Sequence, residues 1–436
     1  MLNLVKDEYK KVLLFAVVLF YLVGPVFRVA HAYLSDIFFA VVFVLLFLSG
    51  VKLNFSEKFS KLFLMPAAIV LICTAGKLLS RFTLGGDEIA SMLNYVKLYF
   101  LFILTYSVFT SNNRSELLNK DLKVLNYIIL FFVLFVSAIG ILQFVGSPAA
   151  NFILTNLYHV VHTTGSDNLS EFAELNRVTS IFDSFNGFGI VLCFSLFMLA
   201  FINSELKNYF GLFVILIGIG MIVLTGNRAS LLTFFFMTLV YFVSIKQKFS
   251  KKKIGIGFGV IALAGIIFYF AASNLSIYNF FRYYEFALLF QKGDIPHTIG
   301  VRLVKWEWIP QHMASVKQML FGYTTNDFIK DRIYDSPDSQ YLNWLVYLGY
   351  VGAVLFITWI FYTLISFFKR KQFQFISNIS YLKKSNNFFI VYWIGLILIG
   401  VFQESFFFGR LRELFIFFLA FNCAYANLSA RKISET

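Results

Sequence analysis

Charged side chains are scarce in this chain of 436 residues. Aspartate, glutamate, lysine and arginine together make up 14% of the sequence, whereas 59% of residues are hydrophobic and the mean hydropathy is +0.76. A water-soluble protein of this length needs far more polar side chains to cover its surface. The composition therefore excludes a soluble protein and indicates one that is surrounded by lipid.

Cysteine is also rare, and no nucleotide-binding loop is found. The three cysteines, Cys73, Cys193 and Cys423, lie in apolar runs without paired spacing, so the sequence supports neither a disulfide framework nor a zinc site. The glycine-rich stretch at 255–259 is typical of a small-residue helix, not of a phosphate-binding loop. The first apolar run has no small-residue cleavage pattern, so we expect it to remain as a helix.

Long apolar runs are the main feature of the sequence. A helix that spans a bilayer needs about 20 mostly apolar residues, and the chain contains many such runs. The sequence predicts an all-α bundle of about twelve transmembrane helices, at 12–30, 33–50, 61–79, 92–110, 123–145, 185–203, 208–224, 229–246, 255–273, 341–367, 387–403 and 411–427.

The net charge of +14 raises the possibility of nucleic-acid binding, so the location of the positive residues matters. When the N-terminus is placed in the cytoplasm, most of the 37 lysines and arginines fall in short cytoplasmic connections, as the positive-inside rule requires. The C-terminus is then cytoplasmic as well. The charge reflects membrane topology, and we expect no nucleic-acid partner.

Two polar segments interrupt the apolar runs, and both fall on the outer side of the membrane. They divide the chain into N-terminal transmembrane helices, a first outer loop, central transmembrane helices, a large outer loop and C-terminal transmembrane helices, at 1–145, 146–184, 185–273, 274–340 and 341–436. Within the large loop, 301–318 has the pattern of an amphipathic helix, and Trp306 and Trp308 suit the membrane interface. We expect this loop to cap the outer mouth of the bundle.

The segment Thr225–Ser230, with the sequence TGNRAS, favours anion binding between two predicted helices. Gly226 permits a tight turn, and Thr225 or Asn227 can cap the second helix. Backbone N–H groups at that helix start attract an anion, and Arg228 adds a fixed positive charge. The alternative is an ordinary turn whose arginine extends to the membrane surface.

Other polar motifs stand in a definite order around this segment. Arg177 leads to Asn186 at a predicted helix start, and an R-x-x-x-W pattern at 302–306 follows the TGNRAS segment. Asp338-Ser339-x-Tyr341-Leu342 and an L-G-x-x-G pattern at 348–352 come last. Over residues 175–355, this order resembles that of the O-antigen polymerase and ligase superfamily of bacterial inner-membrane glycan-transfer proteins.

The resemblance implies a periplasmic active site that acts on an undecaprenyl-diphosphate-linked oligosaccharide. It implies that Arg228 and Arg302 bind the pyrophosphate, and that membrane lipid, a chain-length regulator and a flippase are partners. Chemistry agrees, because negative charge grows on a departing lipid diphosphate and guanidinium groups can stabilise that charge directly. We therefore expect no metal and no other cofactor.

The acceptor hydroxyl needs a base, and Asp338 is the candidate. Ligases of this superfamily typically carry histidine there, so the aspartate favours a polymerase. Asp338 can equally cap the next helix, and His297 and His312 are rival bases. The remaining candidates for diphosphate or substrate binding are Arg177, Asn186, Arg282, Tyr341 and Arg410.

Three further charged residues, Glu413, Arg410 and Lys97, stand near helix ends or inside an apolar run. A pair between Glu413 and Arg410, one turn apart, is expected to be structural. Lys97 stands inside an apolar run, where it either extends to the membrane surface or contacts a phosphate.

The sequence thus predicts a surface-polysaccharide polymerase. It would move a growing glycan from undecaprenyl diphosphate to another undecaprenyl-diphosphate-linked repeat unit on the periplasmic face. A ligase that delivers the glycan to lipid A-core or protein is the alternative. A flippase or transporter ranks lower, because the ionisable residues lie near the outer ends of helices and not along a central path.

Overall fold

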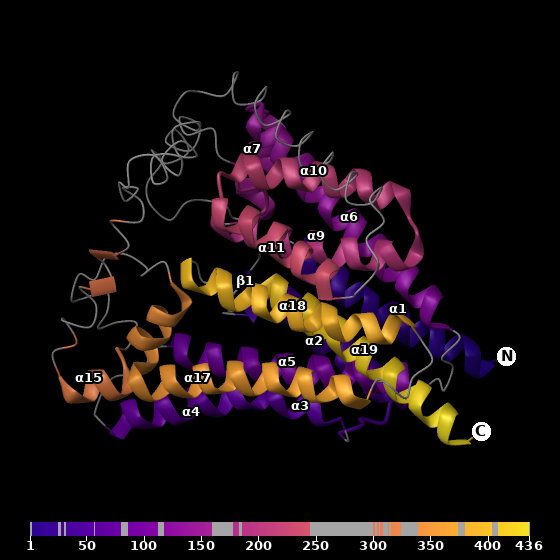
Figure 1. Ribbon diagram of the computed structural model, residues 1–436, viewed down its shortest axis with the longest axis horizontal. Coiled ribbons are helices and arrows are strands. Elements are labelled where there is room, and N and C mark those ends of the chain that lie inside the picture. Colours follow the sequence, from indigo (N-terminus) through magenta and orange to yellow (C-terminus); the bar gives the residue numbers. More distant parts are fainter. Residues whose placement is uncertain are drawn as a thin grey trace. The chain divides into compact units, whose positions relative to one another are not determined.

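The computed structural model is almost entirely helical (Figure 1). It describes residues 2–24, 28–29, 32–55, 57–79, 86–111, 117–158, 178–182, 185–244, 300, 303–304, 306–307, 313, 315–323, 339–373, 380–402 and 409–435. The chain divides into two compact units. Unit 1 holds 1–24, 28–128 and 302–436, and unit 2 holds 25–27 and 129–301.

Unit 1 combines the N-terminal and C-terminal helices of the chain. Its described elements are α1 (Leu2–Val23), β1 (Arg28–Val29), β2 (Ala32–Tyr33), α2 (Leu34–Leu48), α3 (Lys58–Leu62), α4 (Leu64–Leu79), α5 (Gly86–Ser111), the start of α6 (Leu118–Phe144), α15 (Val316–Phe321), α17 (Gln340–Phe373), α18 (Ser380–Phe402) and α19 (Gly409–Glu435). The two strands form a two-residue antiparallel pair.

Unit 2 is built from the rest of α6 and from the central helices. Its described elements after α6 are α7 (Pro148–Leu157), α9 (Phe185–Leu206), α10 (Tyr209–Thr225) and α11 (Arg228–Ser244). The side chains of α9 are almost all buried, because α10 and α11 both pack against it. By contrast, α10 leaves large apolar side chains such as Phe210 and Phe213 exposed, as expected of a helix that faces lipid.

Seven helices among the described residues are long and apolar enough to cross a membrane. They coincide with the predicted spans at 61–79, 92–110, 123–145, 185–203, 341–367, 387–403 and 411–427. Three shorter apolar helices, Leu34–Leu48, Tyr209–Thr225 and Arg228–Tyr241, match three further predictions. The predicted span 255–273 lies outside the described residues. The membrane character is therefore supported, and the count of about twelve stays a prediction.

The first predicted span differs from the structure at its end. We expected a helix over 12–30, but α1 ends at Val23. Pro25 follows two residues later, and the residue before a proline is sterically kept from helical conformation. The apolar side chains beyond Val23 therefore extend the hydropathic run without extending the helix.

Contacts within unit 1 give the relative directions of its helices. Arg412 of α19 lies over the ring of Tyr95 in α5, and Phe421 packs against Phe109 further along both helices, so α5 and α19 run parallel. By contrast, Phe417 packs against Phe15 while Arg410 reaches Leu22, so α1 and α19 are antiparallel. These directions match the predicted alternation, while the side of the membrane that each end faces stays a prediction.

Part of the predicted large loop belongs to unit 1, where α15 packs against α17 and α4. The Ser315 hydroxyl and the Gln318 side chain form a capping box, which starts a new helix at Val316. Met313 is buried and non-helical, so the predicted continuous helix over 301–318 is wrong at this point. The capping pattern of Ser315 and Gln318 competes with the apolar periodicity on which that prediction rested.

A kink in α17 receives the end of α15. Gly349 has φ +66°, and a side chain there would collide with the backbone at Leu320 and Phe321. The amide of Tyr323 donates to the carbonyl of Val346 at 2.7 Å, and the ammonium of Lys77 in α4 donates to the Tyr323 carbonyl at 2.8 Å. Gly349, the first glycine of the L-G-x-x-G pattern, thus permits the close packing of α15 against α17 within unit 1.

A buried ion pair joins three helices at the end of unit 1 opposite to Arg410. The ammonium of Lys11 in α1 lies 2.6 Å from the carboxylate of Asp121 in α6, and both residues are 2% exposed. The Tyr425 hydroxyl of α19 donates to the same carboxylate. Removing one partner of such a pair leaves an uncompensated charge in an apolar region.

We predict that Asp121→Ala destabilises unit 1 by about 3–5 kcal/mol, because Lys11 then stays buried without its counter-charge. The measurement is thermal unfolding of the purified protein in detergent. The matched control is Glu8→Ala, which removes the exposed partner of Lys120 on the same two helices. It should cost less than about 1 kcal/mol. Equal melting temperatures for the two variants would show that the buried pair contributes no more than the exposed one.

Candidate functional site

The turn between α10 and α11 is fixed by its own side chains. Gly226 ends α10 with φ +66°, and its amide donates to the carbonyl of Val223 at 2.9 Å. The Asn227 amide donates to the Thr225 hydroxyl at 3.1 Å, while the Asn227 carbonyl oxygen Oδ1 accepts from the amide of Ser230 at 3.1 Å. The predicted tight turn and the predicted cap are therefore confirmed, with Asn227 as the N-cap of α11.

Asn227 also joins this turn to the start of a second helix. Its side-chain nitrogen Nδ2 donates to the backbone carbonyl of Asn186, in the first turn of α9, at 3.1 Å. Gly189 of α9 lies so close that a side chain there would collide with Asn227. The N-termini of α9 and α11 are thus held side by side, and Arg228 is the first residue of α11 and only partly buried. Two positive helix ends and a guanidinium make this region favourable for an anion.

The segment before α9 is anchored beside the same turn. The Gln143 side chain of α6 accepts from the amides of Thr179 and Ser180 at 3.0 and 2.9 Å, and Ser180 takes the left-handed conformation with φ +50°. The amide of Val178 donates to the carbonyl of Leu224, near the end of α10, at 3.4 Å. The residue that follows Arg177 therefore lies next to the chain that leads into Arg228.

The structure describes half of the predicted site residues. Arg228 and Asn186 are brought together in unit 2 through Asn227, whereas Tyr341 and Arg410 belong to unit 1. The other predicted residues, Arg177, Arg282, Arg302 and Asp338, lie outside the described residues, as do the rival bases His297 and His312. Their assignments stay predictions.

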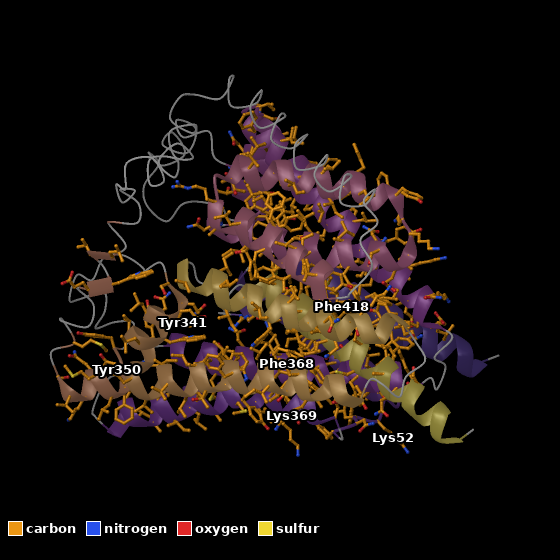
Figure 2. All side chains as sticks on the ribbon, viewed as in Figure 1. Lys52, Tyr341, Tyr350, Phe368, Lys369 and Phe418 are labelled. Carbon is orange, nitrogen blue, oxygen red and sulfur yellow. The ribbon has the colours of Figure 1, made fainter. Side chains whose placement is uncertain are left out.

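Tyr341 and Arg410 both make contacts within unit 1. The Tyr341 hydroxyl donates to the carbonyl of Ile397 in α18 at 2.8 Å, at the end of α17 opposite to Lys369 (Figure 2). The Arg410 guanidinium donates to the carbonyls of Leu22 at 2.5 Å and Gly24 at 3.4 Å, at the C-terminal end of α1. These contacts give both residues a role in holding helix ends together.

A charged cluster near Arg410 was missed by the sequence reasoning. The ammonium of Lys97 lies 2.9 Å from the carboxylate of Asp36 and 2.8 Å from that of Glu413, so one lysine joins α2, α5 and α19. The expected pair between Glu413 and Arg410 is therefore wrong. Helical spacing favoured that pair, but Glu413 forms its ion pair with Lys97, and Arg410 donates hydrogen bonds to backbone carbonyls. The signal that was available is the presence of Lys97 inside an apolar run.

No family model, curated protein or solved structure matches this chain. Among the described residues, no group of three or more histidine, cysteine, aspartate or glutamate side chains is placed to hold a metal ion. The relation to glycan polymerases and ligases accordingly rests on the order of the motifs quoted above and is a proposal.

We predict that Asn227→Ala destabilises unit 2 more than a simple cap deletion does. It removes the N-cap of α11, which is worth about 1 kcal/mol, together with the hydrogen bond to α9. The matched control is Asn208→Ala, since Asn208 caps α10 by accepting from the amide of Phe210 at an exposed site. Unfolding in detergent gives the comparison, and a smaller loss for Asn227→Ala than for Asn208→Ala would contradict the joining role.

Proposed function

We propose that this protein is a polysaccharide polymerase of the outer face of a bacterial inner membrane. It transfers a growing glycan from undecaprenyl diphosphate to another lipid-linked repeat unit. The observation that carries the proposal is the position of Arg228, where Asn227 holds the starts of α9 and α11 together. This arrangement suits a diphosphate, because the backbone N–H groups of two neighbouring helix starts and the guanidinium of Arg228 belong to the same region.

The reaction needs a hydroxyl nucleophile and a stabilised leaving group. A hydroxyl oxygen of the acceptor sugar attacks the anomeric carbon of the donor, and the bond from that carbon to the diphosphate oxygen breaks. The hydroxyl proton passes to a base, for which we propose Asp338, one residue before the buried Ser339. The lipid diphosphate leaves with increased negative charge, which Arg228 and Arg302 stabilise.

The motif order supports these roles together. Arg177, Asn186 and Arg228 belong to one stretch of chain, and the backbone next to Arg177 contacts the end of α10. Two or more guanidinium groups match a diphosphate better than lysines do, because a planar fork binds two oxygens at once. The energy of the sugar–diphosphate bond drives the transfer, so no nucleotide site is required.

We predict that Arg228→Ala and Arg302→Ala each abolish polymer while the protein level stays normal. Lysine at either position should restore little activity, because it keeps the charge and loses the bidentate geometry. Polysaccharide ladders from complemented deletion strains give the readout, with the exposed Lys52→Ala as the control expected to be normal. Full-length ladders from both alanine variants would remove the diphosphate assignment.

The second prediction concerns metal. Purified protein that is supplied with lipid-linked repeat units should form polymer in the presence of EDTA, since guanidinium groups provide the stabilising charge. The measurement is product length with EDTA and with added magnesium. An absolute requirement for a divalent cation would overturn the metal-free scheme. It would not decide whether the substrate is a lipid-linked glycan.

A deletion strain separates polymerase from the other candidate functions. Loss of a polymerase leaves surface glycans of a single repeat, whereas loss of a ligase leaves free lipid-linked polymer. Loss of a flippase traps lipid-linked units on the cytoplasmic side. Only the first result agrees with the proposal.

A further inference from the structure

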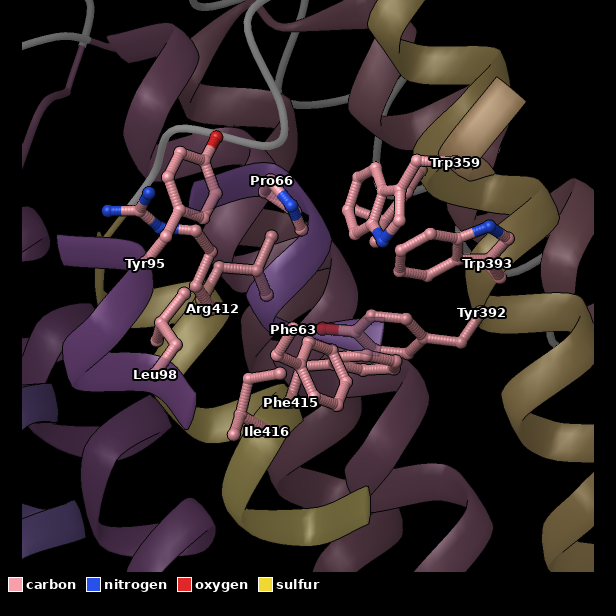
Figure 3. Close-up of a pocket in the computed structure, with 12 residues that line it drawn as sticks. Phe63, Pro66, Tyr95, Leu98, Trp359, Tyr392, Trp393, Arg412, Phe415 and Ile416 are labelled. Atoms are coloured by element: carbon pink, nitrogen blue, oxygen red, sulfur yellow. The ribbon is translucent and has the colours of Figure 1, made fainter. Parts of the chain in front are cut away.

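Unit 1 contains a pocket lined by α5, α17, α18, α19 and residues at the start of α4. It encloses about 500 Å³ of space, a figure that includes the part open to the surroundings. Trp359, Tyr392 and Trp393 gather on one side of the pocket, and Arg412 and Tyr95 lie on the other (Figure 3). The walls are almost entirely aromatic and aliphatic.

The tryptophans present only their rings to the pocket. The indole nitrogen of Trp359 donates to the carbonyl of Leu62 at 2.8 Å, and that of Trp393 donates to the carbonyl of Ile360 at 3.1 Å. Both donors are thus used by neighbouring backbone. The interior therefore suits a hydrocarbon, which needs no hydrogen bonds, better than a sugar, which needs many.

Arg412 differs from the other residues that line the pocket. It is partly exposed, whereas the other eleven are buried, so it marks the mouth. Its guanidinium carbon lies 5.8 Å from the centre of the Tyr95 ring, and the guanidinium is hydrogen-bonded to the Tyr95 side chain. Its buried Nε has no hydrogen-bond partner among the described residues. The neighbouring carboxylate of Glu413 is held by Lys97, and no described acid pairs with Arg412.

A cation at this place favours an anion nearby, in addition to its contact with Tyr95. Arg412 is the fourth residue of α19, near the positive end of the helix dipole, where a further cation is disfavoured unless a negative group accompanies it. Charged groups at membrane depth are costly when they have no partner. An anionic head at the mouth and an apolar chain inside satisfy both halves of the pocket.

We propose that this pocket binds one acyl chain of an anionic phospholipid from the surrounding bilayer, with the lipid phosphate on Arg412. Basic residues at pockets between transmembrane helices recognise lipid headgroups in this way. Phospholipids surround a protein of this kind, because seven of its described helices are long and apolar enough to cross a membrane. None of the residues assigned to glycan transfer lines the pocket, so the inference goes beyond the proposed function and does not depend on it.

The test uses the full-length protein in nanodiscs that contain a phosphatidylglycerol with a photoreactive group on its acyl chain. We expect labelled peptides from α5, α18 and α19. Labelling should be at least about tenfold weaker with the phosphatidylcholine analogue, because its choline cation cancels the net charge of the phosphate beside Arg412 and so weakens a charge-assisted contact worth roughly a factor of ten. Arg412→Gln should remove this preference, whereas Arg412→Lys should keep part of it.

A second variant tests the binding of the acyl chain and leaves the charge of Arg412 unchanged. Ile416→Trp places a larger side chain in the pocket and should reduce labelling by phosphatidylglycerol. Its matched control is Leu232→Trp, at a side chain of α11 that is 61% exposed, which should label normally. Gel filtration shows whether each variant is folded.

Three outcomes would overturn the proposal. The first is equal labelling by both headgroups, and the second is normal labelling of Ile416→Trp. The third is complete displacement of phosphatidylglycerol by an equimolar polyprenyl phosphate, because the pocket would then belong to the substrate class. Loss of labelling in Ile416→Trp with unchanged polymer synthesis would support a phospholipid site that is separate from glycan transfer.

Discussion

A polar or charged group inside a membrane protein has to find its partner within the protein, and this constraint organises both units. In unit 1, Lys97 satisfies the carboxylates of Asp36 and Glu413, and Lys11 satisfies that of Asp121. Each cluster joins three helices that are distant in sequence. In unit 2, the side-chain amide of Asn227 likewise joins the starts of α9 and α11 by hydrogen bonds. Hydrophobic burial brings the helices together, and these few polar contacts decide which ends meet.

The same constraint separates structural cations from candidate binding cations. Lys11, Lys97 and Arg410 are held by acids or backbone carbonyls of their own unit. Arg228 stands at a paired helix start, and Arg412 stands at the mouth of an apolar pocket against an aromatic ring. We propose that the first position binds a diphosphate and the second a lipid headgroup, because Arg228 begins a helix beside a second helix start while Arg412 lies over an aromatic ring.

Hydropathy was enough to predict most helices, because an apolar run of about 20 residues has few alternatives in lipid. It was misleading where local stereochemistry ends a helix, as at Pro25, or starts one, as at Ser315. The turn at Gly226 and Asn227 was predictable because cap and glycine lie next to each other in sequence. The pairing of Glu413 with Lys97 was not, since it joins residues of different helices. The pocket at Arg412 was equally invisible, because five segments of the chain contribute its walls.

The contacts that span unit 1 also determine when it can be completed. Lys77 is synthesised 246 residues before the Tyr323 carbonyl that accepts from it, and Leu22 is synthesised 388 residues before Arg410. During translation, α4 therefore enters the membrane with an ammonium that water or headgroups must solvate until α15 and α17 arrive. The early helices of unit 1 gain their last polar contacts only when α19 is complete. A ribosome that stops before α19 releases a bundle in which Lys97 lacks Glu413, and the carbonyls of Leu22 and Gly24 lack Arg410. Such a product exposes unsatisfied polar groups inside the membrane, and the cell's proteases can use them to recognise an incomplete chain.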